Sequence, residues 1–96
     1  MIGDGEVADL AAIATEVAAY IAPLALLHGK TVAVTGSRRS VPVRGNADTL
    51  GRAVRYLVEN ALAHTAPRTA VEISVGAIGA LSVTDHGPGV PITERE

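Results

Sequence analysis

The chain has 96 residues and a mass of 9.8 kDa, which corresponds to one small domain and excludes two independent ones. Its 8 basic and 10 acidic residues are scattered along the sequence and give a formal charge of -2, which argues against a basic groove for nucleic acid and against a polybasic membrane patch. Because cysteine is absent, disulfides, thiolate metal sites and cysteine nucleophiles are excluded.

The first predicted elements are a short strand or arm at residues 6–8 and a long helix. Asp9 can cap this helix and Gly29 supplies a stop. Apolar side chains recur within it at three- and four-residue spacing: Leu10, Ile13, Val17, Ile21 and Leu24. Its most apolar run, residues 17–27, is interrupted by Pro23 and is shorter than the roughly 20 residues that cross a membrane, so we expect no membrane span.

Two strands follow this helix. Residues 31–35 alternate in polarity, with Val32 and Val34 on one face, and therefore predict a strand. Residues 41–43 predict a second, short strand. Because Pro42 has no backbone N–H to donate, we expect this strand at a sheet edge.

A second helix is predicted to begin after Asn46, whose side chain can cap it, and Asp48 in the first turn suits the positive end of the helix dipole. Pro67 ends the helical stretch. The expected buried stripe is centred near Leu50 and Leu57, and its members are Leu50, Val54, Leu57 and Ala61.

The last predicted elements are two strands, residues 71–75 and 80–85, that pair as a hairpin. Glu72 alternates with the apolar positions of the first strand, so its side chain is expected to point away from the core. The mixed order of helices and strands predicts an α+β fold. We expect a two-layer sandwich, with both helices on one face of a small mixed sheet.

A polar ridge accompanies the stripe of the second helix. Tyr56, Asn60 and His64 follow one another at intervals of four residues and are expected to be half-buried where they border the core. The amide oxygen of Asn60 suits Mg²⁺, and His64 can donate to a phosphate oxygen. The alternative is structural, with Asn60 satisfying a backbone group and His64 capping the last carbonyls of the helix.

A second candidate feature closes the hairpin at residues 85–89 (DHGPG). Asp85 lies two residues beyond Val83 on the same strand face, so its carboxylate is expected on the core side, where it can accept a hydrogen bond from an exocyclic amine such as that of adenine. Gly87 and Gly89 allow the backbone to approach a flat ring or a phosphate closely. The same residues could equally form a sharp turn without a ligand.

Taken together, these two features resemble the ATP-binding catalytic domain of sensor histidine kinases, within the superfamily of gyrase, Hsp90, histidine kinase and mismatch-repair ATPases. Residues 57–65 (LVENALAHT) are similar to the N box of that family, and residues 83–91 (VTDHGPGVP) to its first glycine box. Residues 41–46 (VPVRGN) also resemble the short strand and cap that precede the N-box helix. The resemblance extends over nearly the whole chain.

The resemblance implies specific roles for these residues. Asn60 would hold the Mg²⁺ ion that bridges the phosphates of ATP, and Asp85 would recognise the adenine amine. The resemblance also implies that three residues shape the adenine pocket: Gly87, Gly89 and Val90.

The sequence also departs from the family pattern. Tyr56 stands where a first N-box Asn or a Glu base is usual, Ala63 stands where a phosphate-contacting Lys or Arg is common, and His86 replaces an Asn. Residues 93–96 come where the family continues into the ATP lid, the second glycine box and the final strands. The resemblance therefore implies a single, incomplete domain over residues 1–96, without the phosphoacceptor His.

The expected function is the ATP-Mg²⁺-binding part of a sensor histidine kinase of a two-component system, which presents the γ-phosphate to a His on another domain. The implied partners are ATP, the dimerisation and phosphoacceptor domain of the same kinase and, indirectly, a response regulator. The fragment is expected to be inactive alone and to self-associate, and to be cytoplasmic within a parent kinase that can be membrane-anchored. The alternatives are a non-catalytic nucleotide-binding or regulatory module on the same scaffold, or an unrelated small fold.

Overall fold

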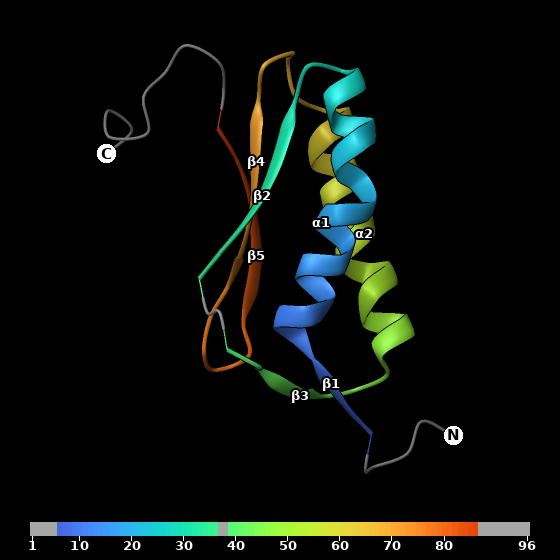
Figure 1. Ribbon diagram of the computed structural model, residues 1–96, viewed down its shortest axis with the longest axis vertical. Coiled ribbons are helices and arrows are strands. Elements are labelled where there is room, and N and C mark those ends of the chain that lie inside the picture. Colours follow the sequence, from blue (N-terminus) through green and yellow to red (C-terminus); the bar gives the residue numbers. More distant parts are fainter. Residues whose placement is uncertain (1–5, 37–38, 87–96) are drawn as a thin grey trace.

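The computed structural model describes residues 6–36 and 39–86 and contains two layers. In Figure 1, two helices lie side by side against one face of a sheet. The elements in chain order are β1 (Val7–Asp9), α1 (Leu10–Leu27), β2 (Thr31–Gly36), β3 (Pro42–Arg44), α2 (Ala47–Ala63), β4 (Ala70–Val75) and β5 (Leu81–His86). This order confirms the predicted elements and the α+β sandwich.

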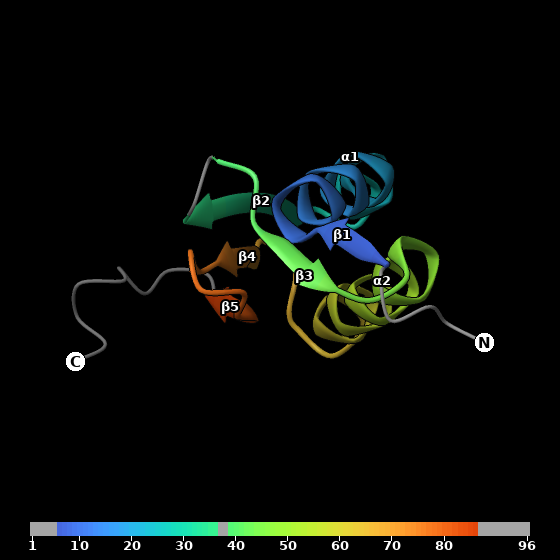
Figure 2. The ribbon, with the colours of Figure 1, turned by 90° about the horizontal axis from the view of Figure 1, so that it is seen from below.

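The strands form two separate sheets. The larger has the order β2-β4-β5, in which β4 pairs with β2 in parallel and with β5 antiparallel. The smaller joins β1 and β3 antiparallel near the beginning of both helices, so the predicted short strand does lie at an edge (Figure 2). In the same view α1 lies beside β2, and α2 lies on the side of β4 and β5.

Both predicted helix caps are confirmed. The Asp9 carboxylate accepts hydrogen bonds from the amides of Ala11 and Ala12 at 3.1 and 3.4 Å. It also accepts one from the amide of Val41 at 2.9 Å, and these bonds lower the pKa of Asp9, the one from Val41 most strongly. In α2, Asn46 accepts a hydrogen bond from the amide of Thr49 at 3.0 Å.

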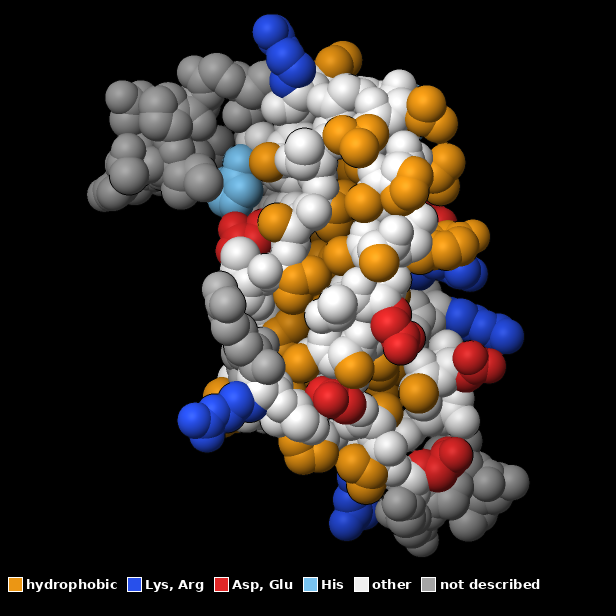
Figure 3. Space-filling view, viewed as in Figure 1, with side chains coloured by type: hydrophobic (Ala, Val, Ile, Leu, Met, Phe, Trp, Pro, Cys, Tyr) orange, Lys and Arg blue, Asp and Glu red, His pale blue; other side chains and the backbone are white. Residues whose placement is uncertain are grey.

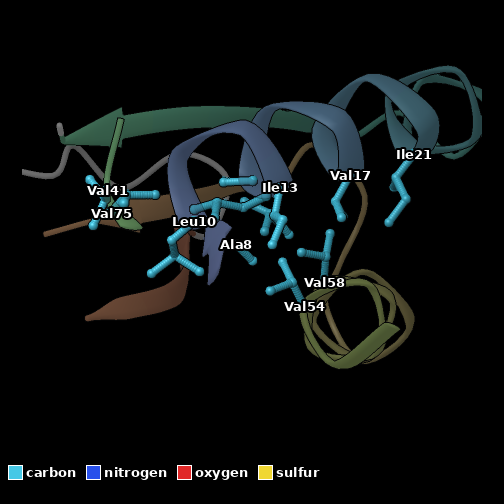
Figure 4. Close-up of a cluster of buried hydrophobic side chains, with 12 residues drawn as sticks. Ala8, Leu10, Ile13, Val17, Ile21, Val41, Val54, Val58 and Val75 are labelled. Atoms are coloured by element: carbon cyan, nitrogen blue, oxygen red, sulfur yellow. The ribbon is translucent and has the colours of Figure 1, made fainter. Parts of the chain in front are cut away.

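The hydrophobic core lies between the helices and the sheet. Figure 4 shows Ile13 and Val17 of α1 facing Val54 and Val58 of α2. The buried cluster consists of Ala8, Leu10, Ile13, Ala14, Val17, Ile21, Val41, Val54, Val58, Val71, Ile73 and Val75.

Two expectations about the helix stripes are wrong. Leu24 is 49% exposed and Leu57 is 48% exposed, whereas Ala25 and Val58 are buried. The stripe of α2 is therefore centred on Val54 and Val58. The reason is that α2 packs against α1 as well as the sheet, so its direction of burial lies between the two contacts.

Helix α1 is apolar on its outer side as well. Figure 3 shows hydrophobic side chains gathered around the end of the molecule that contains its C-terminal half, where Tyr20, Leu26 and Leu27 are exposed. With 18 residues and a hydropathy of 1.9, α1 could cross a membrane by length and composition alone. The core helices of soluble domains can have the same length and mean hydropathy, and α1 buries one side against the sheet.

Candidate functional site

The described residues of the two sequence features, Asn60 and His64 of the first and Asp85 and His86 of the second, lie at the same end of the molecule. Helix α2 ends at Ala63, and the loop 64–69 leads directly into β4. Strand β5 returns antiparallel to β4, so Asp85 pairs with Val71, the second residue of β4. The C-terminal ends of α2 and β5 are therefore both at the top of Figure 1.

Asn60 and His64 lie on the flank of α2 that is turned away from α1. Arg55 and Glu59 line grooves between the two helices and so mark the opposite flank. Leu57, Asn60 and His64 follow at three- and four-residue spacing and share one side of the helix. Because α1 lies beside β2, this flank is on the β5 side of the molecule.

The expectation of a half-buried ridge is wrong, because Tyr56, Asn60 and His64 are all exposed. The shift of the buried stripe to Val54 and Val58 turns the ridge outward. Asn60 and His64 remain next to the half-buried Ala61, so they border the core from the solvent side.

The carbonyl groups of Asn60 and Ala61, in the last turn of α2, accept hydrogen bonds from groups other than the Asn60 carboxamide. Thr65 donates its hydroxyl to the carbonyl of Ala61 at 2.8 Å, and His64 ends the helix through its backbone N–H, which donates to the carbonyl of Asn60. Among the described residues, the side chains of Asn60 and His64 make no hydrogen bond. The structural alternative thus holds for the backbone of His64, which caps the helix, but not for the Asn60 carboxamide, which satisfies no backbone group in the described part of the chain.

Lys30 is a positioning residue that the sequence argument missed. It is buried, and its Nζ donates to the carbonyls of Leu62 and Thr65, the latter at 2.8 Å. A cation is favourable at the negative end of the helix dipole, so Lys30 fixes the last turn of α2 next to Asn60. The sequence pattern could have indicated that Lys30 is buried, because Lys30 is two residues before Val32 and therefore shares the strand face that packs against the helices.

Asp85 lies on the predicted face of β5. Its partner across the strands, Val71, is buried, and paired residues in an antiparallel sheet project to the same side. Leu81 and Val83, on the same face, pack against the core, but the Asp85 side chain itself is exposed. The pocket residues implied by the resemblance, Gly87, Gly89 and Val90, lie outside the described residues.

A second group that the sequence argument missed lies on the opposite face of the sheet. Glu72 accepts a hydrogen bond from the Thr35 hydroxyl at 2.5 Å and contacts His86 Nε2 at 2.9 Å. These two hydrogen bonds, that from Thr35 first, lower the pKa of Glu72. Glu72 thus points away from the core, as predicted.

The donor set limits what metal the site could hold. Within residues 6–36 and 39–86, no group of three or more His, Asp or Glu side chains is close enough to hold an ion. Mg²⁺ is commonly held by one or two protein oxygens together with substrate phosphates, and it needs no complete protein cage. One exposed amide oxygen at Asn60 fits an ion that arrives with a nucleotide.

No family model matches the sequence, and no curated protein matches it either. Solved structures do match. The cytoplasmic segment of histidine kinase QseC has a TM-score of 0.78 at 24% sequence identity, and the nucleotide-free catalytic domain of histidine kinase ThkA has 0.75 at 16%. The mycobacterial sensor histidine kinase MprB has 0.70 at 26%.

The chain has the fold of a sensor histidine kinase catalytic domain. The alignments include 88% of this chain for QseC, 92% for ThkA and 94% for MprB. They include only 52%, 62% and 60% of those chains, respectively, so this chain spans part of each kinase structure. The resemblance inferred from the two sequence motifs is thereby confirmed at the level of the kinase fold.

Proposed function

We propose that this chain is the ATP-Mg²⁺-binding part of a sensor histidine kinase in a two-component system. The observation that carries the proposal is the position of Asn60 and Asp85, on the kinase fold, at one end of the molecule and exposed. Asn60 would ligate Mg²⁺, Asp85 would accept the adenine amine, and His64 would donate to a phosphate oxygen. By resemblance, Gly87, Gly89 and Val90 would shape the adenine pocket.

The proposed reaction is transfer of the γ-phosphoryl group of ATP to a His on another domain. In such transfers a protein contributes mainly positioning and electrostatic stabilisation, so this chain needs no nucleophile of its own. Its partners would be the dimerisation and phosphoacceptor domain of the same kinase and, indirectly, a response regulator. We place this work in the cytoplasm, as for the QseC segment.

A second candidate is a non-catalytic nucleotide-binding or regulatory module. Two residues favour it. Tyr56 stands where the family usually has an Asn or a Glu base. Ala63 stands where the family commonly has a Lys or Arg, and its uncharged side chain cannot form an ion pair with a phosphate. Detectable nucleotide binding without phosphotransfer, in a chain joined to a phosphoacceptor domain, would favour this candidate over the kinase.

We also propose that residues 1–96 belong to one ATP-binding domain of this family and that this chain self-associates. Four large exposed apolar side chains on α1 support self-association, namely Tyr20, Leu24, Leu26 and Leu27. Sedimentation at high micromolar concentration should show dimers or larger species. A stable monomer would contradict this part of the proposal.

The central test is a nuclear magnetic resonance titration of the chain with ATP in the presence and absence of Mg²⁺. We expect a dissociation constant of about millimolar, because Asn60, His64 and Asp85 are exposed to water, where each contact contributes little, and we expect tighter binding with Mg²⁺. Asn60→Ala should abolish the Mg²⁺ enhancement. Glu59→Ala is the matched control, because Glu59 is an exposed neighbour whose side chain lies toward α1.

The outcomes separate the readings. If Asn60→Ala retains the Mg²⁺ enhancement, Asn60 has no role at the metal. If ATP shifts no resonance of α2 or β5 at several millimolar, the proposed function is wrong.

A further inference from the structure

Three side chains connect the strands of the larger sheet on its outer face, the face turned away from α1 and α2. They are Thr35 of β2, Glu72 of β4 and His86 of β5. Thr35 donates its hydroxyl to Glu72 Oε2 at 2.5 Å, and His86 Nε2 lies 2.9 Å from Glu72 Oε1. An ionised carboxylate only accepts hydrogen bonds, so His86 is the donor. We call these three residues the brace.

The register of the strands explains why one carboxylate can reach both neighbours. Glu72 lies directly between Ala33 of β2 and Thr84 of β5. Thr35 and His86 are each two residues further along their strands, on the same face. Glu72 therefore lies between two diagonal neighbours within reach of a long side chain, and each of its oxygens binds one of them.

Two members of the brace, His86 and Glu72, are partly shielded from water, whereas Thr35 is exposed. The side chain of His86 is 17% exposed and that of Glu72 is 32% exposed. Hydrogen bonds to a charged group that is partly withdrawn from water contribute more than those on an open surface. The brace is thus a better anchor than the exposed i,i+4 pair of Arg55 and Glu59, which are 4.0 Å apart.

The position of the brace relative to Asp85 gives it a further role. His86 directly follows Asp85, and neighbouring residues in a strand project to opposite faces. The His86 side chain contacts Glu72 on the outer face of the sheet, while the Asp85 carboxylate lies on the face toward the helices. In the described part of the chain, β5 pairs with β4 alone, so its last residues depend on this pairing and on the brace.

We propose that His86 is a positioning residue, which, through Glu72 and Thr35, fixes the end of β5 and thereby the Asp85 carboxylate that reads adenine. The adenine part of this inference rests on the proposed function. His86 itself touches no ligand in this scheme, because its side chain lies on the other face of the sheet. In this chain His86, at the position where the family usually has Asn, contacts Glu72 on the neighbouring strand.

The first measurement is amide hydrogen exchange of β5 in the free chain. His86→Ala, Glu72→Gln and Thr35→Val should each accelerate exchange of the β5 amides nearest residue 86 by about threefold to tenfold, the range expected for one net hydrogen bond. Ser82→Ala is the matched control, because Ser82 lies on the same face of β5 at its other end. His86→Gln, which retains a side-chain N–H, should restore part of the protection.

The second measurement is the affinity for ADP, determined by nuclear magnetic resonance titration. The three brace variants should each weaken ADP binding by about threefold to tenfold, and the double variant His86→Ala with Glu72→Gln should be no weaker than either single variant. If His86 and Glu72 contributed independently to the structure, the losses of affinity in the two single variants would add in the double variant.

The two measurements distinguish the two hypotheses. If ADP does not bind the wild-type chain, the proposed function fails, and the exchange rates still decide whether the brace holds β5. If ADP binds and the brace variants change neither exchange nor affinity, His86 has no positioning role. Faster exchange with unchanged affinity would also overturn the link from the brace to Asp85.

Discussion

The two faces of the β2-β4-β5 sheet are built from different chemistry. On the face toward the helices, the β4 residues Val71, Ile73 and Val75 are each no more than 1% exposed. On the outer face the alternating β4 residues Glu72 and Ser74 are polar and half-buried. The helix side holds the fold together by burial, whereas the outer face adds hydrogen bonds at one corner.

The difference shows where stability and positioning reside. The apolar face ends in Asp85, a carboxylate that contributes nothing to burial because it is exposed. The polar face ends in the brace, directly behind it. Substitutions on the helix side should therefore change mainly the free energy of unfolding, and those around the brace mainly the geometry of the candidate site.

The largest effect is expected at the centre of the helix side. Ile73 is 0% exposed, between Val34 and Val83 of the neighbouring strands. Ile73→Ala should lower the free energy of unfolding by about 3 kcal/mol, because it leaves a cavity that the rigid sheet cannot close. Urea denaturation measures this loss, which is a large share of the roughly 5 kcal/mol expected of a domain this small.

Thr84→Ala is the control on the other face, because Thr84 is exposed and lies opposite Glu72. It should change the free energy of unfolding by less than about 0.5 kcal/mol. Equal losses in the two variants would remove the distinction between the faces.

The next effect concerns Lys30, the buried cation on the helix side. Lys30→Met keeps the apolar stem but removes the donors to the carbonyls of Leu62 and Thr65, at a cost of about 2 kcal/mol. Hydrogen exchange in the last turn of α2 should accelerate more than exchange elsewhere. Arg52→Met, an exposed position on the same helix, serves as the control and should leave that turn protected.

A smaller effect, on affinity and not on stability, is expected at the end of the helix side. Asp85→Asn should weaken ADP binding about tenfold, because the amide replaces the acceptor of the adenine amine with a weaker and partly mismatched group. Asp48→Asn at the far end of α2 is the matched control and should leave ADP affinity unchanged. Equal, small losses measured by titration would remove Asp85 from the site.

The smallest effect is a pH dependence from the outer face. The hydrogen bonds from Thr35 and His86 hold the pKa of Glu72 below its usual value of 4.5. A carboxyl group whose pKa is lower in the folded state stabilises the fold above its unfolded pKa, and this contribution is lost as the pH falls through the folded value. The stability advantage of wild type over Glu72→Gln should therefore shrink below about pH 4.5. An advantage that grows on acidification would contradict the assignment.

Much of the fold could be predicted from local patterns. Asp9 and Asn46 were recognisable as caps because a short polar acceptor before an apolar repeat is favoured at a helix start. The alternation around Ile73 predicted a strand and placed Glu72 on the outer face. The order of the N box and glycine box predicted the kinase fold, which the structural matches confirm.

The direction in which α2 is buried could not be predicted in this way. The sequence offers apolar side chains over a wide arc of this helix, and both Leu57 and Val58 are suitable for burial. The simultaneous contact with α1 and the sheet selects Val58 and leaves Leu57, Asn60 and His64 on the open flank. The helical periodicity of the sequence defines the width of the apolar arc of α2. The packing of α2 against α1 and the sheet determines which residues lie at the centre of the buried part.

By itself the sequence determined the elements, their order and the two motifs, because caps, turns and periodicity act over a few residues. Only the tertiary structure decided that Lys30 holds the end of α2 and that Glu72 joins Thr35 to His86. Each of these contacts links residues more than ten positions apart. Such contacts depend on strand register and helix placement, which follow from packing of the whole chain and not from any local pattern.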